Sequence, residues 1–472
     1  KVKRAEGERG KKPAASRTAV CRRFRSFIIH LFPAKASAEA ETRRICRLSA
    51  AYFAACSAIR FAIRPRSVLR RINCGQGLDR CARTRYNGRV NAGGRMLYFD
   101  YAATTPLDGE VLEKMLPLLK ENFGNPDSLH AYGRAAMRAV DEARDLFASL
   151  IGAKPEEIYF TSGGTEADNW AILCGARAQA KAGKPRVLIS AIEHHAALSA
   201  AERLEKEGFP VAYLPVNEWG RVEVSALKEV LSPDVGLVAV MAANNETGAV
   251  QPFRECARLA RENGSLFFTD AVQAAPYMPV DASDWGADMI AFSAHKFFGP
   301  KGAGALYIRR GVQIPPLISG GEQERGLRGG TRNVAAIAGL SAAYRKAAKE
   351  REENNAHIRA VSAAFLSELA ARCPQAKRNG AGELLPGIVN LTFPDVDNAA
   401  FLTAMDLHGA AVSAGAACAA SSVRPSHVLL AMGLSEREAG SSVRFSFGRD
   451  NTVEEGIAGA RLAAEVYEKI RR

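Results

Sequence analysis

A carboxylate and a lysine follow two apolar segments of the chain at positions that suit covalent cofactor chemistry. Asp270 and Gln273 come after the apolar segment Ser265–Thr269, and Lys296 comes after Asp288–Ser293. Such runs are typical of buried parallel strands, whose carboxyl ends meet at one edge of a sheet. A lysine there can hold pyridoxal phosphate (PLP) as a Schiff base, while a carboxylate keeps the pyridine nitrogen protonated. A lone lysine after a strand is more often a surface residue, so the hypothesis needs other motifs.

A glycine-containing loop between a predicted strand and a predicted helix supplies a candidate phosphate site. The loop runs from Thr161 to Glu166, and its Gly164 and Thr165 allow backbone N–H groups to approach an anion at a helix N-terminus. Ser293 and His295 can donate further hydrogen bonds to the same phosphate. The alternative is an ordinary turn in which Thr165 is the N-cap of the helix.

Two further polar segments follow predicted strands. His194 comes after the strand Arg186–Ser190, where an imidazole can stack on a cofactor ring and transfer protons, although a histidine at a strand end is more often structural. Asn245 lies in an Asn-rich segment after Met241, and its amide can reach the ring or the substrate. The alternative for this segment is a turn held by asparagine side chains.

A cysteine and an arginine in the C-terminal quarter complete the candidate residues. Cys418 lies in a loop of small residues from Val412 to Ser422, where a thiol is accessible and can act as a nucleophile. A free cysteine is otherwise usually a small buried hydrophobe. Arg444, in the predicted strand Ser442–Ser446, can clamp an amino acid carboxylate with its guanidinium group. The alternative is a strand arginine in a surface ion pair.

The net charge of +14 comes from the first 95 residues, which hold 24 basic and 5 acidic side chains. Residues 96–472 are mildly acidic, with 40 basic against 45 acidic residues, and give no reason to expect nucleic-acid binding. Three interpretations of residues 1–95 stay open: translated upstream sequence before a natural start at Met96, an Arg-rich organelle transit peptide, or a basic tail for polyanions. We expect this segment to be poorly ordered.

Cysteine spacing and hydropathy exclude several other classes. The four cysteines after residue 95 have no CxxC spacing, so neither a zinc site nor a disulfide framework is predicted, and a reducing compartment fits. No apolar run reaches 18 residues, so no membrane span is expected.

Strand and helix patterns alternate between about residues 110 and 350, which predicts an α/β fold with a mostly parallel sheet covered on both faces. The expected strands are Glu157–Thr161, Arg186–Ser190, Val211–Leu214, Gly236–Met241, Ser265–Thr269, Asp288–Ser293 and Ala303–Ile308. The expected helices are Asp141–Ile151, Glu166–Ala182, His195–Lys206 and Phe253–Asn263. An Ala-rich helix, Asn333–Ala348, leads into a smaller domain with strands Gly387–Phe393 and Ser442–Ser446.

Ten segments in this order resemble the cysteine desulfurases, PLP enzymes of the class V aminotransferase family with the aspartate-aminotransferase-type fold (fold type I). They include Tyr98–Pro106, Phe123–Pro126, Thr161–Glu166, Glu193-His194, Asn244–Glu246, Asp270–Gln273, Ser293–Lys296, Arg325–Thr331, the Cys418 loop and Ser441–Ser446. The long cysteine loop resembles the nitrogen-fixation and housekeeping branch. Ala414 and Ala416 stand where that branch usually has serine, which leaves the rate and the choice of acceptor open.

The resemblance implies a role for each candidate residue. Lys296 binds PLP and moves protons, Asp270 pairs with the pyridine nitrogen, Gln273 bonds the phenolic oxygen and His194 stacks on the ring. The phosphate is held by Gly164, Thr165, Ser293 and His295, and by Thr331 of the other subunit of a homodimer. Asn245 and Arg444 orient L-cysteine. Cys418 takes the sulfur as a persulfide and leaves alanine.

The resemblance also implies the setting of the reaction. It predicts a large PLP-binding domain at 108–350, a small domain formed by 96–107 with 351–472, and residues 1–95 as an extension outside the family. The acceptor is an iron–sulfur scaffold or a tRNA- or cofactor-thiolation protein; no resident metal is expected, although Cys418 can transiently contact a partner's iron–sulfur cluster. A bacterial cytoplasmic location is expected, or organelle import if residues 1–95 are a transit peptide.

Two alternatives stay open at this point. One is another PLP enzyme of the same fold, such as a selenocysteine lyase or a class V aminotransferase. The other is a sulfur-carrier scaffold that has lost catalysis, against which the presence of Lys296, Asp270 and His194 argues.

Overall fold

The computed structural model describes residues 96–415 and 425–471 of the chain. The predicted disorder of residues 1–95 and the predicted nucleophile Cys418 therefore lie outside the described residues. Within the described ranges, no helix is long and apolar enough to cross a membrane.

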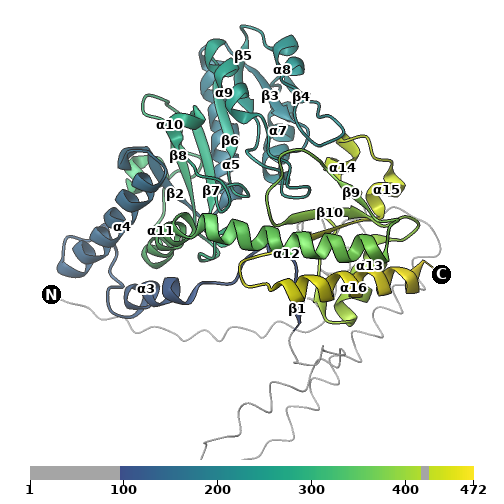
Figure 1. Ribbon diagram of the computed structural model, residues 1–472. Coiled ribbons are helices and arrows are strands. Elements are labelled where there is room, and N and C mark those ends of the chain that lie inside the picture. The colour runs from purple at the N-terminus through teal and green to yellow at the C-terminus, as the bar shows by residue number, and fades with distance from the viewer. Residues whose placement is uncertain (1–95, 416–424, 472) are drawn as a thin grey trace, which may run out of the picture. The chain divides into compact units, whose positions relative to one another are not determined.

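A seven-stranded sheet forms the centre of the fold (Figure 1). Its strand order is β2-β8-β7-β6-β5-β3-β4, and all neighbours from β7 to β4 are parallel, whereas β8 runs antiparallel to β7 and β2. The strands are β2 (Ile158–Thr161), β3 (Arg186–Ser190), β4 (Val211–Leu214), β5 (Val235–Ala239), β6 (Leu266–Asp270), β7 (Met289–Ser293) and β8 (Gly304–Ile308). The predicted α/β fold with a mostly parallel sheet is confirmed.

Helices cover both faces of this sheet, because its strands are apolar on both sides. On β6, Phe267 belongs to one hydrophobic core and Phe268 to the other. The first core includes side chains of α3 (Gly109–Lys120), α4 (Ala131–Leu150), α8 (Val224–Val230), α9 (Phe253–Glu262), α10 (Ala282–Trp285) and α11 (Val334–Lys349). The second includes side chains of α5 (Gly164–Asn169), a π-helical segment (Trp170–Cys174), α6 (Gly175–Lys181) and α7 (His195–Lys206).

A second, smaller assembly of strands and helices surrounds its own apolar core. It contains the antiparallel sheet β12-β10-β9, formed by Ser442–Ser446, Ile388–Thr392 and Lys377–Asn379, and the pair β1 (Leu97–Tyr98) with β11 (Ala410–Ala411). Helices α12 (Arg351–Arg372) and α16 (Val453–Ile470) lie side by side beneath these strands (Figure 1). Three short helices complete it: α13 (Asn398–Leu407), α14 (His427–Ala431) and α15 (Glu436–Gly440). The division into domains at residues 108 and 350 stays a prediction.

Most predicted elements coincide with observed ones within two residues, and two helices differ in an informative way. The helix predicted at Asp141–Ile151 begins ten residues earlier, at Ala131, because the side chain of His130 accepts a hydrogen bond from Gly133 N and caps it. The helix predicted at Glu166–Ala182 is interrupted by the π-helical segment, in which every residue is buried.

Gly304 at the start of β8 holds the loop after β2 in place. A Cβ atom at this position would lie 2.6 Å from both Gly163 Cα and Phe292 O, which is closer than folded proteins tolerate. Gly304→Ala should therefore lower the free energy of unfolding by about 2 kcal/mol or more, measured by denaturant unfolding.

Gly440→Ala is the matched control, because a Cβ atom there would meet nothing within 4 Å. We expect its effect to stay within about 0.5–1 kcal/mol. Equal losses in the two variants would show that the contact with Gly163 does not constrain the fold.

Candidate active site

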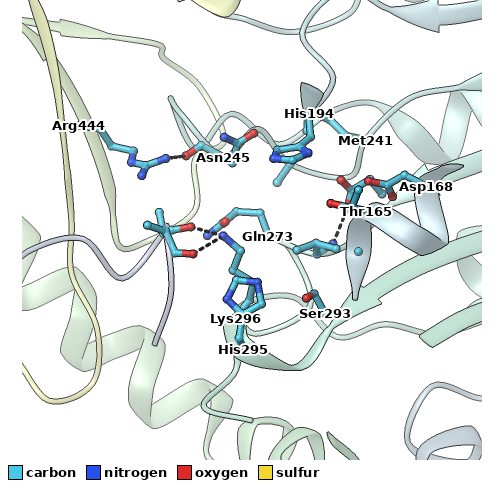
Figure 2. Close-up of a pocket in the computed structure, with 16 residues that line it drawn as sticks. Thr165, Asp168, His194, Met241, Asn245, Gln273, Ser293, His295, Lys296 and Arg444 are labelled. Carbon is cyan, nitrogen blue, oxygen red and sulfur yellow. Dashed lines mark hydrogen bonds between the residues drawn. The ribbon is translucent and has the colours of Figure 1, made fainter. Parts of the chain in front are cut away.

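A cavity of about 160 Å³ lies at the carboxyl ends of β6 and β7, where the sequence placed the site. Ten of the twelve predicted site residues line it: Gly164, Thr165, His194, Asn245, Asp270, Gln273, Ser293, His295, Lys296 and Arg444. Cys418 lies outside the described residues, and Thr331 is exposed and does not line the cavity. Segments that are far apart in sequence thus meet at one place (Figure 2).

Lys296 follows β7 directly, in a single 3-10 turn that begins at Ala294. Its side chain enters the cavity, and its ammonium group donates hydrogen bonds to the backbone oxygens of Ala102 and, at 3.0 Å, Ala103 (Figure 2). These carbonyls come from the segment after β1, so two distant parts of the chain position the amine.

Asp270 is the last residue of β6 and is almost fully buried. Burial raises the pKa of its carboxyl group to about 6, while the backbone N–H of Val272, 2.7 Å from Oδ1, and the charge of Lys296 oppose the shift. Gln273, one turn further, is also buried, and its Oε1 has no hydrogen-bond partner among the described residues. A buried amide oxygen without a partner points to a ligand that supplies the missing hydrogen bond.

The loop before α5 forms a cradle with the geometry that an anion requires. Gly163 adopts φ +153° and is the residue that precedes the helix, so the alternative of Thr165 as N-cap is wrong. The first N–H groups of α5 have no partner within the helix, and Gly164 and Thr165 in its first turn line the cavity. A Cβ atom on Gly163 would lie 3.7 Å from Ser293 Oγ, which places that hydroxyl beside the cradle.

The side chain of Glu166 is occupied with structural bonds instead of facing the cradle. Its carboxylate accepts from Ser162 N at 2.8 Å and pairs with Arg328 at 2.9 Å. These bonds lock the loop and tie it to the segment that carries Thr331.

His295 lies below the cradle. Its Nδ1 forms a hydrogen bond with Thr104 Oγ1 at 3.1 Å, and burial lowers the pKa of the imidazole to about 4.

His194 is the N-cap of α7, and its Nδ1 accepts a hydrogen bond from Ala196 N at 3.1 Å. Burial, together with the smaller effects of Lys296, His195 and His427, lowers its pKa to about 4. The imidazole is therefore neutral at pH 7 with its proton on Nε2. A neutral planar ring at the cavity wall suits stacking on an aromatic ligand.

The two neighbouring asparagines of the Asn-rich turn have different positions and contacts. Asn244 is fully buried and accepts hydrogen bonds from the backbone of Glu246 and Thr247, as a structural turn residue does. Asn245 lines the cavity, and its carbonyl oxygen accepts from Arg444 Nη1 at 2.8 Å. Arg444 is buried and also pairs with Asp100 at 3.0 Å, so the surface-ion-pair alternative is wrong.

The described residues that flank positions 416–424 of the cysteine loop converge on Glu246. Ser426 Oγ donates to Glu246 Oε2 at 2.5 Å, and a Cβ atom on Gly415 would lie 2.7 Å from the same oxygen. The backbone oxygen of Ser413 accepts a hydrogen bond from the backbone N–H of Arg444, and Arg444 lines the cavity. Cys418 is three residues from Gly415, a reach of about 10 Å for an extended chain.

Three residues of this site were not singled out by the sequence as functional: Asp168, which lines the cavity, the fully buried Glu193, and Glu246. Asp168 was hidden inside a predicted helix, and the other two appeared only as neighbours of His194 and Asn245. A charged residue in an apolar helical stretch is the signal that could have identified Asp168.

The residues present fit PLP. The chain supplies a lysine inside the cavity, a buried carboxylate, an unpartnered amide, a neutral imidazole and a small-residue cradle at a helix N-terminus. In the described ranges no cluster of His, Cys, Asp and Glu could hold a metal ion.

Comparison with known proteins agrees with this geometry. The class V aminotransferase family model matches residues 97–456. The chain is similar to the putative cysteine desulfurase IscS 1 of Bacillus subtilis (strain 168), with 45% identity over 79% of this chain and 99% of that protein. Among solved structures it is similar to a NifS-like protein (TM-score 0.74, 36% identity, 79% of this chain and 100% of that one).

A structure described as SspA in complex with cysteine is also similar, with a TM-score of 0.65 and 35% identity over 75% of this chain and 99% of that one. Family match, identity and coverage lead to the same assignment as the site. The chain belongs to the class V aminotransferase family and, within it, to the cysteine desulfurases.

Proposed function

We propose that this PLP-dependent cysteine desulfurase converts L-cysteine into L-alanine and takes the sulfur onto Cys418 as a persulfide. The Cβ–S bond of cysteine breaks, a new S–S bond forms with the Cys418 thiolate, and Cβ receives a proton. The reaction therefore needs no outside oxidant or reductant. The observation that carries the proposal is the cavity in which Lys296, Asp270 and His194 meet, in a chain of this family.

Each cavity residue has a defined part in holding the cofactor. Lys296 Nζ is the point of attachment, and the carboxylate of Asp270 is the counter-charge for the ring nitrogen. Gln273 and Asn245 supply amides at the ring edge, and the neutral ring of His194 provides a flat contact. Gly164, Thr165, Ser293 and His295 hold the phosphate. When bound, PLP supplies an electron sink that side chains cannot provide.

Residues of this chain also bind the amino acid and move protons. Arg444 and Asn245 orient L-cysteine, with the buried guanidinium as the partner of its carboxylate. Lys296 would accept and return protons at Nζ beside the bound substrate, and the neutral His194 would donate a hydrogen bond from Nε2–H. Cys418 then delivers its persulfide to an iron–sulfur scaffold or a tRNA- or cofactor-thiolation protein.

Cys418→Ser removes the nucleophile and leaves the cofactor site intact. With a thiol reductant present to release the persulfide sulfur as sulfide, we expect alanine and sulfide formation from L-cysteine to fall by about 100-fold or more, while the visible absorbance of bound PLP is unchanged. Amino acid analysis, a sulfide assay and a spectrum of the same sample provide the measurement.

Cys373→Ala is the matched control, because Cys373 is buried in the smaller core and burial raises the pKa of its thiol. This variant should keep alanine formation. Alanine formed at the wild-type rate by Cys418→Ser would contradict the assignment of the nucleophile.

We also propose that the chain acts as a homodimer. Four exposed apolar side chains gather between the end of α3 and the start of α4: Leu119, Phe123, Leu129 and Tyr132. The rings of Phe123 and Tyr132 stack at 5.6 Å, and Leu129 is 91% exposed. Single exposed hydrophobics are ordinary, whereas four within one short segment, two of them in contact, favour a contact surface.

This apolar group adjoins the segment of Thr331. Arg332 pairs with Asp127, in the loop between α3 and α4, at 2.7 Å, and Gln323 bonds the same carboxylate at 2.9 Å. A partner subunit that covers the apolar group would therefore lie against Thr331. Such an arrangement fits a role for Thr331 at the phosphate of the other subunit.

Phe123→Asp combined with Leu129→Asp should convert a dimer into a monomer, because both charges would be buried in the interface. Analytical ultracentrifugation measures the change, and the monomer should retain PLP less tightly. Leu407→Asp, on α13 and 63% exposed, is the control and should stay dimeric. A wild-type monomer, or a doubly substituted dimer, would refute this surface as the interface.

The predicted location is the bacterial cytoplasm. The alternative of organelle import depends on residues 1–95, which lie outside the described residues.

A further inference from the structure

Three carboxyl groups are buried together at the cofactor cavity. Asp168 comes from α5, Glu193 from the segment after β3, and Asp270 from the end of β6. Their side chains are 1%, 0% and 5% exposed, and each lies within electrostatic range of the other two. Asp168 and Asp270 both line the cavity, so two of the three face a bound ligand directly.

Among the described residues, the group contains more carboxylates than cations to pair with them. Neither Asp168 nor Glu193 forms an ion pair there, and Asp168 Oδ1 and Glu193 Oε2 are buried without a hydrogen-bond partner. Arg444, the buried arginine of the cavity, pairs with Asp100 and lies on the opposite side from Asp168 (Figure 2). The other titratable groups that line the cavity are the neutral His194 and His295, Lys296 and the paired Arg444.

Three neighbouring buried carboxyl groups cannot all be charged, because burial and mutual repulsion both favour the protonated forms. The order in which they ionise follows from their contacts. Asp270 has a backbone N–H and Lys296 to stabilise its charge, and its pKa is raised only to about 6. Burial, a backbone bond from Met241 and the neighbouring Asp270 leave the pKa of Glu193 at about 8. The pKa of Asp168 is raised well above its ordinary value by burial and by both neighbours.

We propose that Asp168 is a positioning residue of the cofactor site, a neutral carboxylic acid that leaves Asp270 as the single carboxylate facing the cavity. The proposal rests on the proposed function, because Asp270 is taken there as the counter-charge of the PLP ring. A charged Asp168 would force the proton onto Asp270, and a protonated Asp270 cannot hold the ring nitrogen protonated. Asp168 therefore acts through Asp270.

Infrared spectroscopy of the holoenzyme at about pH 7 tests the protonation of Asp168 directly. The protein is prepared with aspartate carrying ¹³C in its side-chain carboxyl group, which shifts aspartate bands away from those of Glu193 and other glutamates. Exposed aspartates are ionised at this pH and contribute no carbonyl band of the acid form. We expect one such band in the wild-type protein, its loss in Asp168→Asn, and its retention in the control Asp406→Asn, which alters an exposed residue of α13.

The pH dependence of PLP absorbance supplies a second readout. Asp168→Asn replaces one neutral group with another of the same size. The pH at the midpoint of the absorbance change should therefore move by less than about 0.3 pH units. Removal of a charge beside Asp270 would instead move it by about 1 unit or more.

Two results would overturn the proposal: no acid-form aspartate band in the wild-type protein, or a band that persists in Asp168→Asn. If Asp168→Asn does not fold, the labelled Asp168→Glu variant decides, since the acid-form aspartate band must disappear there. None of these measurements uses L-cysteine. Failure of the proposed function would appear separately, as absent alanine formation in a protein that still shows the band.

Discussion

Parallel pairing between β6 and β7 sets the distance between the two groups that define this site. Asp270 pairs with Ala291 in the register, so the two strands end together and Lys296 emerges one short turn beyond Ser293. A register slip of one residue would turn Asp270 toward the opposite face of the sheet. The strands cannot slip easily, because Phe267 and Phe268 fill different hydrophobic cores on the two faces.

Burial at this edge determines the charge of the groups around the cavity. The imidazoles of His194 and His295 are neutral at pH 7 because burial lowers both pKa values to about 4. Asp270 keeps its charge because Val272 N–H and Lys296 compensate for its burial. Lys296 and Asp270 thus lie at the same cavity as two neutral imidazoles, while the cavity's other cation, Arg444, is paired with Asp100.

The sequence predicted the parts of this site that depend on local pattern. Apolar runs that end in polar residues located Asp270, Ser293 and Lys296, and the structure places them at one edge of the sheet. Such patterns cannot show which of two adjacent asparagines turns inward, and only the structure separates the structural Asn244 from Asn245 at the cavity. The helical pattern around Asp168 likewise gave no sign that its carboxyl group lies within electrostatic range of Asp270.

Features that depend on contacts between distant segments could not be predicted from the sequence pattern. The start of α4 at Ala131 follows from a cap by His130, a residue type that is not a usual N-cap. The role of Glu246 depends on both sides of the cysteine loop meeting at one carboxylate. Thr331 is exposed in one chain, so its predicted role concerns a second subunit.

Reductive trapping of the cofactor tests the central claim most directly, because it reports where PLP is attached. The holoenzyme is treated with borohydride and digested, and the peptides are analysed by mass spectrometry. The account predicts that reduced cofactor is found on Lys296 and is absent from a Lys296→Ala variant treated in the same way. Cofactor attached to another lysine, such as Lys301, or no attachment in a protein that binds PLP, would contradict it.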